Sequence, residues 1–492
     1  MFLVVEGEGE RLGFAAVVEG LNMSVLHLNR DRFFPGEPGT RAIARRLFEA
    51  VERLPIISPH GHCDPAWFAT DAQFADPATL MIARDHYVFR MLHSRGVPLT
   101  ALGIGARDDG ATAPAPRDAW RLFAQNYHLF RGTPTRLWHD HVYAEVFGLD
   151  VRLGPGTADL YFDVISEALA SPALRPRALF ERFGIEVLAT TESPLDALEH
   201  HRAIAASGWG GRVITTYRPD PVVDPDREDF VANLQRFSEV TGQDALDWKG
   251  YLSAHRRRRL DFIAAGATAT DHGHPSAATA NLSPADAEAL FARVRAGRPA
   301  AAEAELFRAQ MLTEMARMSL DDGLVMQLHP GSLRNHDRRL FATHGRDMGA
   351  DIPTATDYVH ALRPLLERFG DAPGLTLIVF TLDESAYSRE LAPLAGHYPA
   401  LRLGPAWWFH DSPEGMRRFR ERTTETAGFY NTVGFNDDTR AFPSIQARHD
   451  LARRIDCGFL ARLVAEARLA EDEAAEVAHD LAYRLPKEAY RL

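Results

Sequence analysis

The chain has 492 residues, of which 46% are apolar and 25% charged, and a formal net charge of −12. This composition is that of a folded globular protein with enough apolar material for one large core or two moderate ones, and it excludes disorder of the whole chain. The negative balance argues against a nucleic-acid or anionic-membrane partner. It does not argue against a small anionic substrate bound by a local group of arginines.

Cysteine content and the N-terminal sequence set the expected compartment. Cys63 and Cys457 are too few to build a disulfide framework, so we expect a reducing cytoplasm. Acidic residues interrupt the apolar start, so no signal peptide is expected, and no window reaches the roughly 20 apolar residues of a membrane-spanning helix. We expect residues 1–22 to be a disordered extension ahead of a single metal-dependent domain over 23–492.

Short apolar, β-branched segments recur along the chain with helical stretches between them. They are residues 54–62, 185–193, 212–220, 267–274, 324–331, 375–383, 401–409 and 432–440. Near-continuous apolar runs are typical of strands buried on both faces, and their alternation with helices indicates parallel βα units. Eight such units, most of them ending in polar residues, predict an α/β fold: a (β/α)8 barrel of the TIM type with its site at the C-terminal strand ends. No GxGxxG turn follows the first strand, so no nucleotide cofactor is expected.

The first two predicted strands are separated by residues 63–183, an interval too long for an ordinary connection. Aromatic and aliphatic residues recur in it with helical spacing, which predicts a helical insertion able to cap the barrel mouth. Residues 276–322 predict a second helical excursion. Residues 443–492 predict two or three extra C-terminal helices that complete or extend the outer ring.

The strongest chemical signal is Pro59-His60-Gly61-His62, at the end of the first predicted strand. Residues i and i+2 of a strand point to the same face, so two imidazoles there can bind one divalent ion. A chain with 21 histidines contains chance His-x-His pairs, and a structural pair is the alternative. The position at the first strand of a barrel favours a metal site. His272 and His274, at the fourth strand, form a rival pair.

The last predicted strand ends with Asn436-Asp437-Asp438-Thr439-Arg440. Strand alternation would place Asp438 and Arg440 on one face, beside the first strand of a closed barrel, with Asp437 facing outward. Asp438 is therefore the third candidate metal ligand. A turn carrying a surface Asp–Arg pair would be the alternative for this motif in isolation.

Eight ordered motifs carry a family resemblance. They are PIISPHGHCDP, DHYVFRML, TTESPLDALEHH, TYRPD, DHG, MQLHPGSLRNHD, AWWFHDSPEGM and NDDTRAF. Together they resemble the uronate (glucuronate) isomerase family of the amidohydrolase superfamily, from about residue 27 to the end. The resemblance implies that His60, His62 and Asp438 bind one divalent metal, usually described as zinc. It also implies interconversion of D-glucuronate with D-fructuronate and of D-galacturonate with D-tagaturonate.

The sequence departs from the binuclear hydrolases of that superfamily. His329 ends the fifth predicted strand, but the sixth ends Thr381-Leu382-Asp383 without a histidine, and no bridging lysine stands at the third or fourth strand end. We therefore expect one metal ion and not two. His329 stays open between a metal ligand and a substrate contact.

Aldose–ketose isomerisation removes the proton at C2, passes through an enediol or enediolate and returns a proton to C1. It needs a base, an acid and a group that stabilises negative charge on oxygen. Asp438 is the candidate that moves the hydroxyl proton, and Arg440 the candidate that stabilises the oxyanion. Tyr87 is a candidate C–H base or acid if neighbouring charge lowers its pKa, with packing as the alternative. Its neighbour His86 is assigned to substrate binding.

The carboxylate of a sugar acid requires a cation, ideally a planar two-pronged one. Arg218 is the preferred partner and Arg334 the reserve. The other expected substrate contacts are Asp271, His272, His329, Trp407 and Trp408. A structural hydrogen-bond network is the alternative for the fourth-strand residues, and one of the two tryptophans is expected to pack into the wall.

Two other function classes are open from the sequence alone. A hydrolase of the same superfamily would keep the barrel and metal but activate water, and the missing sixth-strand histidine disfavours it. A noncatalytic sugar-acid binding protein would keep the arginines without a metal, and the His-x-His pair with Asp438 disfavours it. The expected partner is a small hexuronate, without nucleic acid or membrane, and a homo-oligomer is left open.

Overall fold

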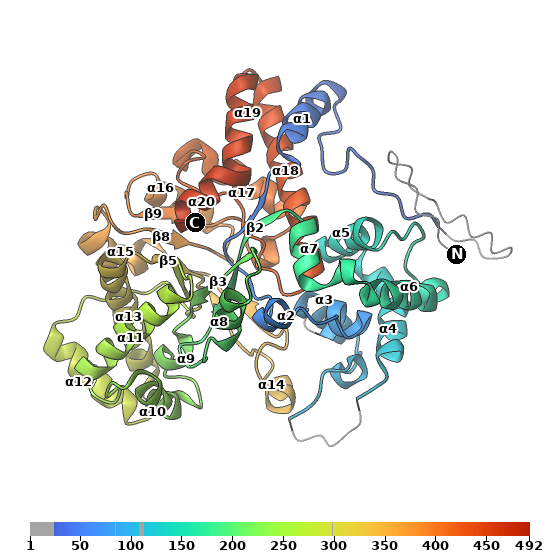
Figure 1. Ribbon diagram of the computed structural model, residues 1–492. Helices are drawn as coiled ribbons and strands as arrows, with labels where there is room; N and C mark the ends of the chain where they lie inside the picture. Colours follow the sequence, from blue (N-terminus) through green and yellow to red (C-terminus); the bar gives the residue numbers. More distant parts are fainter. Residues whose placement is uncertain (1–23, 84, 108–112, 298) are drawn as a thin grey trace.

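A computed structural model describes residues 24–83, 85–107, 113–297 and 299–492. The predicted disordered extension, residues 1–22, lies outside these ranges. Within the described residues, seven parallel strands form one curled sheet in which spatial order follows chain order (Figure 1). The strands are β1 (Ile56–Ser58), β2 (Ile185–Glu192), β3 (Arg212–Tyr217), β4 (Ala269–His272), β5 (Val325–Leu328), β8 (Leu377–Val379) and β9 (Leu401–Leu403).

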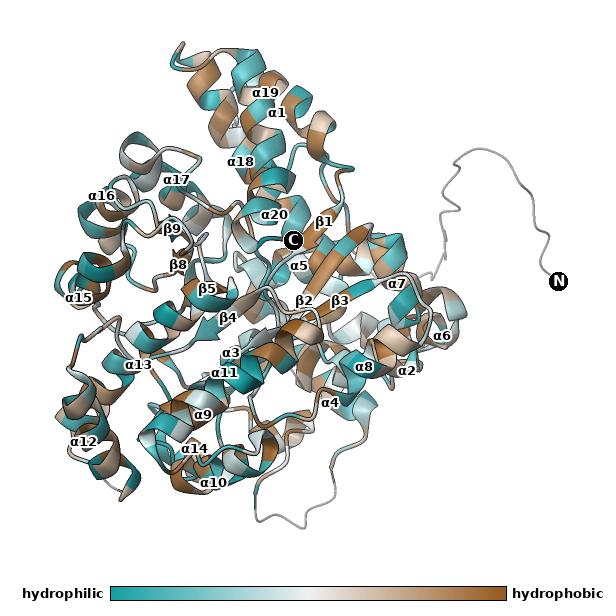
Figure 2. Cartoon of the chain, turned by 60° about the vertical axis from the view of Figure 1, so that its left-hand side comes forward, coloured by the Kyte–Doolittle hydropathy of each residue, from teal (hydrophilic) through white to brown (hydrophobic). Residues whose placement is uncertain are grey.

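The strands form where the sequence is apolar and β-branched, because such residues can be buried on both faces of a parallel sheet. All positions of β4, β5 and β8 are buried. β2 pairs with β3 in a continuous register from Val187 opposite Arg212 to Glu192 opposite Tyr217. β1 and β2 are largely brown with apolar residues in Figure 2, whereas β4 is pale to teal, and the surrounding helices alternate brown and teal. The parallel α/β architecture predicted from the sequence is therefore present.

The eighth predicted strand, residues 432–440, is not a regular strand in the structure. A single parallel bridge pairs Thr432 with Leu403 of β9. Gly434 and Asp438 have φ angles of 75° and 44°, which is left-handed and breaks an extended backbone. At the other end of the segment, the His62 N–H donates to the Thr439 carbonyl at 2.8 Å. The segment thus contacts both edges of the sheet without completing a regular eighth strand.

Helices follow the strands and cover the outside of the sheet (Figure 1). Those that follow β2 to β9 are α8 (Glu199–Ala206), α9 (Asp220–Val223), α10 (Phe230–Thr241), α11 (Trp248–Ala264), α12 (Pro284–Arg295), α13 (Ala301–Asp322), α14 (Arg338–His344), α15 (Val359–Phe369), α16 (Ala392–Ala395) and α17 (Pro413–Ala427). The C-terminal helices are α18 (Ile445–Ala465), α19 (Glu471–His479) and α20 (Leu485–Tyr490), and α18 packs on the early helix α1 (Pro38–Val51). Among the described residues, no helix combines the length and apolar character needed to span a bilayer.

The chain between β1 and β2 is helical and lies to one side of the sheet (Figure 1). Its α-helices are α2 (Pro65–Thr70), α3 (His86–His93), α4 (Pro116–Gln125), α5 (Pro134–His141), α6 (Ala158–Ala170) and α7 (Pro176–Arg182). The second helical excursion predicted at 276–322 contains α12 and α13. A separate segment follows β5, where the short antiparallel strands β6 (Ser332–Leu333) and β7 (Ile352–Pro353) flank α14. The helical insertion and this segment after β5 both contribute residues to the cavity described next.

Candidate active site

A cavity of about 290 Å³ opens at the C-terminal ends of the strands. This volume is close to the lower end for small-molecule sites, which suits a ligand of monosaccharide size. Nearly all the site residues predicted from the sequence line it. They are His60, His62, His86, Tyr87, Arg218, Asp271, His329, Arg334, Trp407, Trp408, Asp438 and Arg440.

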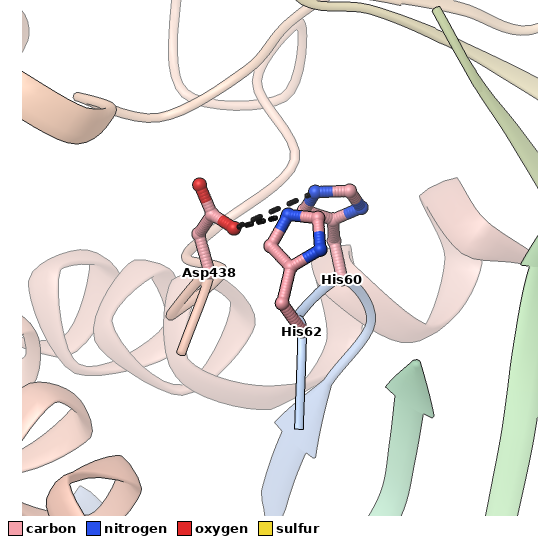
Figure 3. A group of neighbouring side chains, drawn as sticks. All are labelled: His60, His62 and Asp438. Atoms are coloured by element: carbon pink, nitrogen blue, oxygen red, sulfur yellow. Dashed lines mark ion pairs between the residues drawn. The ribbon is translucent and has the colours of Figure 1, made fainter. Parts of the chain in front are cut away.

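Three of these residues form a compact group of possible metal ligands (Figure 3). One oxygen of Asp438, Oδ1, faces the Nε2 atoms of His60 at 3.7 Å and His62 at 3.1 Å. The other oxygen accepts a hydrogen bond from Trp407 Nε1 at 2.8 Å. β1 ends at Ser58, so the two histidines follow the strand and do not lie within it, yet their rings are 5.3 Å apart.

The charges of this group fit a divalent cation. His60 is 1% exposed, and this burial lowers its pKa to about 4, so the imidazole is neutral at neutral pH, as a metal ligand must be. Burial by itself would raise the pKa of Asp438, but the His62 hydrogen bond and the nearby imidazoles hold it well below its usual range. Two neutral imidazoles and one carboxylate are a common donor set for zinc, and the Trp407 contact orients the carboxylate from outside.

A second group of possible ligands shares His60 and adds Asp271 and His329. Asp271 already has partners on both oxygens: His329 Nδ1 donates to one at 2.6 Å, and Arg218 lies 3.1 Å from the other. This engagement disfavours Asp271 as a ligand. His329 is stacked on His60 with ring centroids 4.8 Å apart, and its Nε2 has no hydrogen-bond partner among the described residues. This arrangement leaves Nε2 of His329 open to either a metal ion or a substrate, so both alternatives for His329 stand.

Arg218 is held by two carboxylates. Its Nε lies 2.9 Å from Asp220, and its pKa is raised because the attraction of Asp271 and Asp220 outweighs the effect of burial. The Gly273 N–H donates to Asp220 at 3.2 Å. A Cβ at Gly273 would lie 2.3 Å from Arg218 Nη2, so only glycine allows the guanidinium to cross this strand end.

The other predicted arginine, Arg334, pairs with Asp351 at 2.8 Å and lies over the Trp408 ring at 5.2 Å. Trp408 also contacts the His86 ring edge to face at 5.5 Å. Trp407 contacts Asp438 and lies 4.6 Å from His329 between ring centroids. Both tryptophans therefore line the cavity, whereas we expected one of them to pack into the wall.

The geometry bears on the predicted roles of Tyr87 and His272. Burial raises the pKa of Tyr87 far above its usual value, and the nearby Arg448 does not reverse this, so the condition for Tyr87 to act as a base is not met. Tyr87 stays available as a neutral hydrogen-bond donor. His272 is fully buried and hydrogen-bonded to Thr270 Oγ1 at 3.0 Å, and it does not line the cavity. The Nε2 atom of His272 points back along β4 toward Thr270, so the ring lies within the sheet and not in the cavity.

Asp347 is a cavity residue that the sequence analysis missed. It has a φ of 60°, a left-handed conformation that is uncommon outside glycine, and it lies between β6 and β7. Its pKa is lowered to about 2, because Arg440, Arg334 and Arg218 together outweigh the effect of burial. The only sequence signal was its position in the glycine-flanked turn Gly345–Gly349, which does not point to a site.

The sequence matches the family model of glucuronate isomerase over residues 38–490. The chain belongs to this family. It is 69% identical over 467 residues to a uronate isomerase of Phenylobacterium zucineum, covering 95% of this chain and 97% of that protein. The resemblance that the eight motifs predicted is therefore confirmed.

Solved structures agree with this assignment. The crystal structure of glucuronate isomerase from Caulobacter crescentus has a TM-score of 0.94 and 61% sequence identity, over 95% of this chain and 98% of that one. A uronate isomerase from Thermotoga maritima has a TM-score of 0.87 at 26% identity, over 94% and 99% of the two chains. The family likeness thus extends over the sheet, both excursions and the cavity-lining segments.

Proposed function

We propose that this protein interconverts hexuronates by aldose–ketose isomerisation, D-glucuronate with D-fructuronate and D-galacturonate with D-tagaturonate. Membership of the uronate isomerase family supports the reaction. The observation that carries it in the structure is one cavity in which the group His60, His62 and Asp438 lies beside three arginines, Arg218, Arg334 and Arg440. A sugar acid presents a carboxylate and several hydroxyls, which are the ligands such a cavity can hold.

One divalent metal ion, zinc by preference, is part of this proposal, with His60, His62 and Asp438 as its ligands. When bound, such an ion acts as a Lewis acid toward the developing oxyanion. Asp438 Oδ1 faces the imidazoles of His60 and His62 and is the group that moves the hydroxyl proton. Trp407 holds the other oxygen of Asp438. The strained backbone at Asp438, with a φ of 44°, aims the carboxylate at the two imidazoles.

The remaining roles belong to groups around this centre. Arg440 stabilises negative charge on the enediolate oxygen, and Arg218 holds the substrate carboxylate, with Arg334 as the reserve. Tyr87 donates a hydrogen bond in its neutral form, and His86 contacts a sugar hydroxyl. The Asp85 side chain supports both positions, because it accepts from the Tyr87 N–H at 2.8 Å and caps the first turn of α3.

The wider architecture is also proposed to follow the sequence prediction. We infer that the segment 432–440 closes the sheet into an eight-unit barrel, a reading supported by its backbone contacts with Leu403 and His62. The main apolar core runs from Leu26 to Ile455, which supports a single domain that includes the helical insertion. Cys63 and Cys457 are buried free thiols, which supports a reducing cytoplasm as the location.

A metal-dependent hydrolase of the same superfamily is the second candidate. The predicted sixth-strand end offers Thr381 and Asp383 in place of a histidine, and Asp271 is held by Arg218 and His329. The group His60, Asp271 and His329 is therefore disfavoured as the site of a second ion that would help to activate water. This difference favours isomerisation.

The test is incubation with D-glucuronate and with D-galacturonate, following keto-acid formation before and after chelation. We expect a ketose product without a leaving group, loss of turnover on chelation and recovery with added Zn²⁺. Hydrolysis of an ester or amide library without any keto acid would overturn the proposal.

A further inference from the structure

Two buried residues in the first turns of α18, Arg448 and His449, do not line the cavity. Arg448 is 2% exposed, and its charge must be matched by nearby groups, because an isolated buried cation is very unfavourable. Its partners come from three separate parts of the chain. All three parts also supply residues to the cavity.

The first two partners lie in the loops on either side of α17. Arg448 Nη1 is 2.7 Å from Asp411, in the loop between β9 and α17, and it donates to the Asp437 carbonyl at 3.0 Å. Asp411 follows Trp407 and Trp408 by only a few residues. Burial raises the pKa of Asp411 to about 7, although Arg448 acts in the opposite direction.

The third set of partners comes from the helical insertion. The guanidinium carbon of Arg448 lies 3.6 Å from the ring centroid of Trp138 and 5.5 Å from that of Tyr87. Both distances are within the range of cation–π attraction. The two rings also contact each other edge to face at 5.6 Å. Arg448 therefore joins the insertion to the barrel directly behind Tyr87.

His449 holds the same residue, Asp437, from its other side. Its Nε2 donates to Asp437 Oδ2 at 3.0 Å, and the Thr439 N–H donates to Oδ1 at 3.2 Å. Both the carbonyl and the carboxylate of Asp437 are thus fixed by α18 and the adjacent turn. The next residue is Asp438, whose left-handed φ of 44° requires such support in a residue other than glycine.

We propose that Arg448 and His449 form a positioning clamp that fixes the Asp438 carboxylate against His60 and His62 and holds Tyr87 at the cavity wall. The clamp rests on the proposed function for its catalytic consequence, but its effect on metal affinity can be measured without turnover. Neither residue touches the cavity, so both act through Asp437, Asp438 and Tyr87.

Arg453, five residues further along α18, provides a matched control. It is 6% exposed and, like Arg448, donates to backbone carbonyls, here those of Glu52 at 2.9 Å, Leu54 at 2.9 Å and Pro55 at 3.0 Å. These contacts lie at the start of β1, away from the cavity lining. Arg448→Lys and Arg453→Lys are therefore the same substitution at two buried positions on one helix.

The experiment compares Tm, kcat, KM and Zn²⁺ affinity in the two variants, below both melting temperatures. Outer-sphere support of metal ligands is typically worth about 10- to 100-fold, so we expect Arg448→Lys to weaken Zn²⁺ binding and lower kcat by factors in that range, with KM nearly unchanged. Arg453→Lys should lower Tm while leaving kcat and Zn²⁺ affinity near wild type. Equal losses of kcat and affinity in both variants would overturn the clamp.

His449 supplies a second test if Arg448→Lys folds poorly. His449→Gln can keep a donor near the Nε2 position, whereas His449→Leu cannot. The clamp therefore predicts weaker Zn²⁺ binding and an altered Co²⁺ absorption spectrum in the leucine variant. The glutamine variant should restore both. Identical affinity and spectra in both would refute it. If the variants change Zn²⁺ binding as expected but the wild-type protein has no isomerase activity, the clamp stands and the proposed function is wrong.

Discussion

The chain contains the tripeptide His-Gly-His twice, just after β1 and at the C-terminal end of β4 in the same sheet. The rings of His60 and His62 are 5.3 Å apart at an interplanar angle of 84°, and those of His272 and His274 are 5.9 Å apart at 86°. The two pairs are nearly the same in their internal geometry. Whatever separates a metal site from a structural pair must therefore lie in their surroundings.

The surroundings differ in the third residue. Beside the first pair, Asp438 lies 3.1 Å from His62 with an oxygen directed at both imidazoles. In the second pair, His272 is engaged with Thr270, and Asp220, the carboxylate that acts most strongly on the pKa of His274, binds the Gly273 N–H and Arg218. The second motif thus fixes an arginine, and a His-x-His pattern predicts a metal only together with its third ligand.

Removing the third ligand should have the largest effect. Asp438→Asn keeps the size of the side chain and tolerates a left-handed φ, so we expect an intact fold. The variant loses the anionic ligand and the proton acceptor together, and a general base alone contributes about 10²- to 10⁴-fold, so turnover should fall by at least about 10³-fold. The measurement is kcat with Zn²⁺ in excess, with circular dichroism as the folding control. Turnover near wild type would refute the proton-transfer role.

The two pairs can next be separated by one matched substitution. His60→Asn should weaken Zn²⁺ binding by at least about 100-fold, because a direct ligand is worth more than an outer-sphere partner. His274→Asn should keep the bound metal, since neither group of three potential ligands in the described residues includes His274. Metal content after gel filtration measures both. Loss of metal from the His274 variant would show that the second pair is also a binding site.

Seven of the eight strand positions and most of the cavity could be predicted from the sequence. Strands have a strong local signal, because a run such as Ile185–Glu192 has a near-continuous apolar and β-branched pattern. Polar residues at strand ends converge by topology, which is why Arg218, Asp271 and His329 were found without any knowledge of distances. Beyond the strands the backbone is no longer regularly extended, since Asp438 is left-handed, yet Asp438 and Arg440 both line the cavity and Asp437 does not.

The parts that could not be predicted depend on contacts between distant segments. Arg448 is one of several arginines in α18, and nothing local distinguishes it from Arg453. Asp347 lies in a turn whose place at the cavity is set by the packing of Gly349 against Arg90, where a Cβ would approach to 2.8 Å. The pKa of Tyr87 depends on its burial, which the insertion determines. These are tertiary effects that residue spacing does not encode.

Alanine substitutions of the central glycines of the two motifs, Gly61 and Gly273, should have smaller effects, and only the change at Gly273 should raise KM. A Cβ at Gly273 would lie 2.3 Å from Arg218 Nη2, whereas at Gly61 the nearest atoms would be 3.5 Å away, an ordinary contact. Gly273→Ala should displace Arg218 and raise KM for D-glucuronate by about 10-fold, the lower value expected for losing a charged hydrogen bond. Gly61→Ala should leave KM within a few-fold of wild type.

Arg218→Lys is the benchmark for this test, because lysine keeps the charge but loses the two-pronged geometry. If Arg218 holds the substrate carboxylate, the KM of the Arg218→Lys variant should rise as in Gly273→Ala, while kcat changes little. If KM stays near wild type in both variants, Arg334 and not Arg218 binds the substrate carboxylate.

The smallest effect concerns the pH dependence of stability at His272. Burial lowers its pKa to about 3 from an ordinary value of 6.5, so between these values the unfolded chain is protonated at this site and the folded chain is not. Stability is therefore lost as pH falls through this window, with a slope of about 1.4 kcal/mol per pH unit from this one group. His272→Gln removes the titration and should reduce the measured slope between about pH 4 and pH 6 by nearly that amount.

Thr270→Val removes the hydrogen-bond partner but leaves the imidazole, so it should lower the free energy of unfolding at every pH with the slope retained. Urea denaturation at several pH values distinguishes the two, and an unchanged slope in the glutamine variant would mean that His272 takes up its proton in the folded protein.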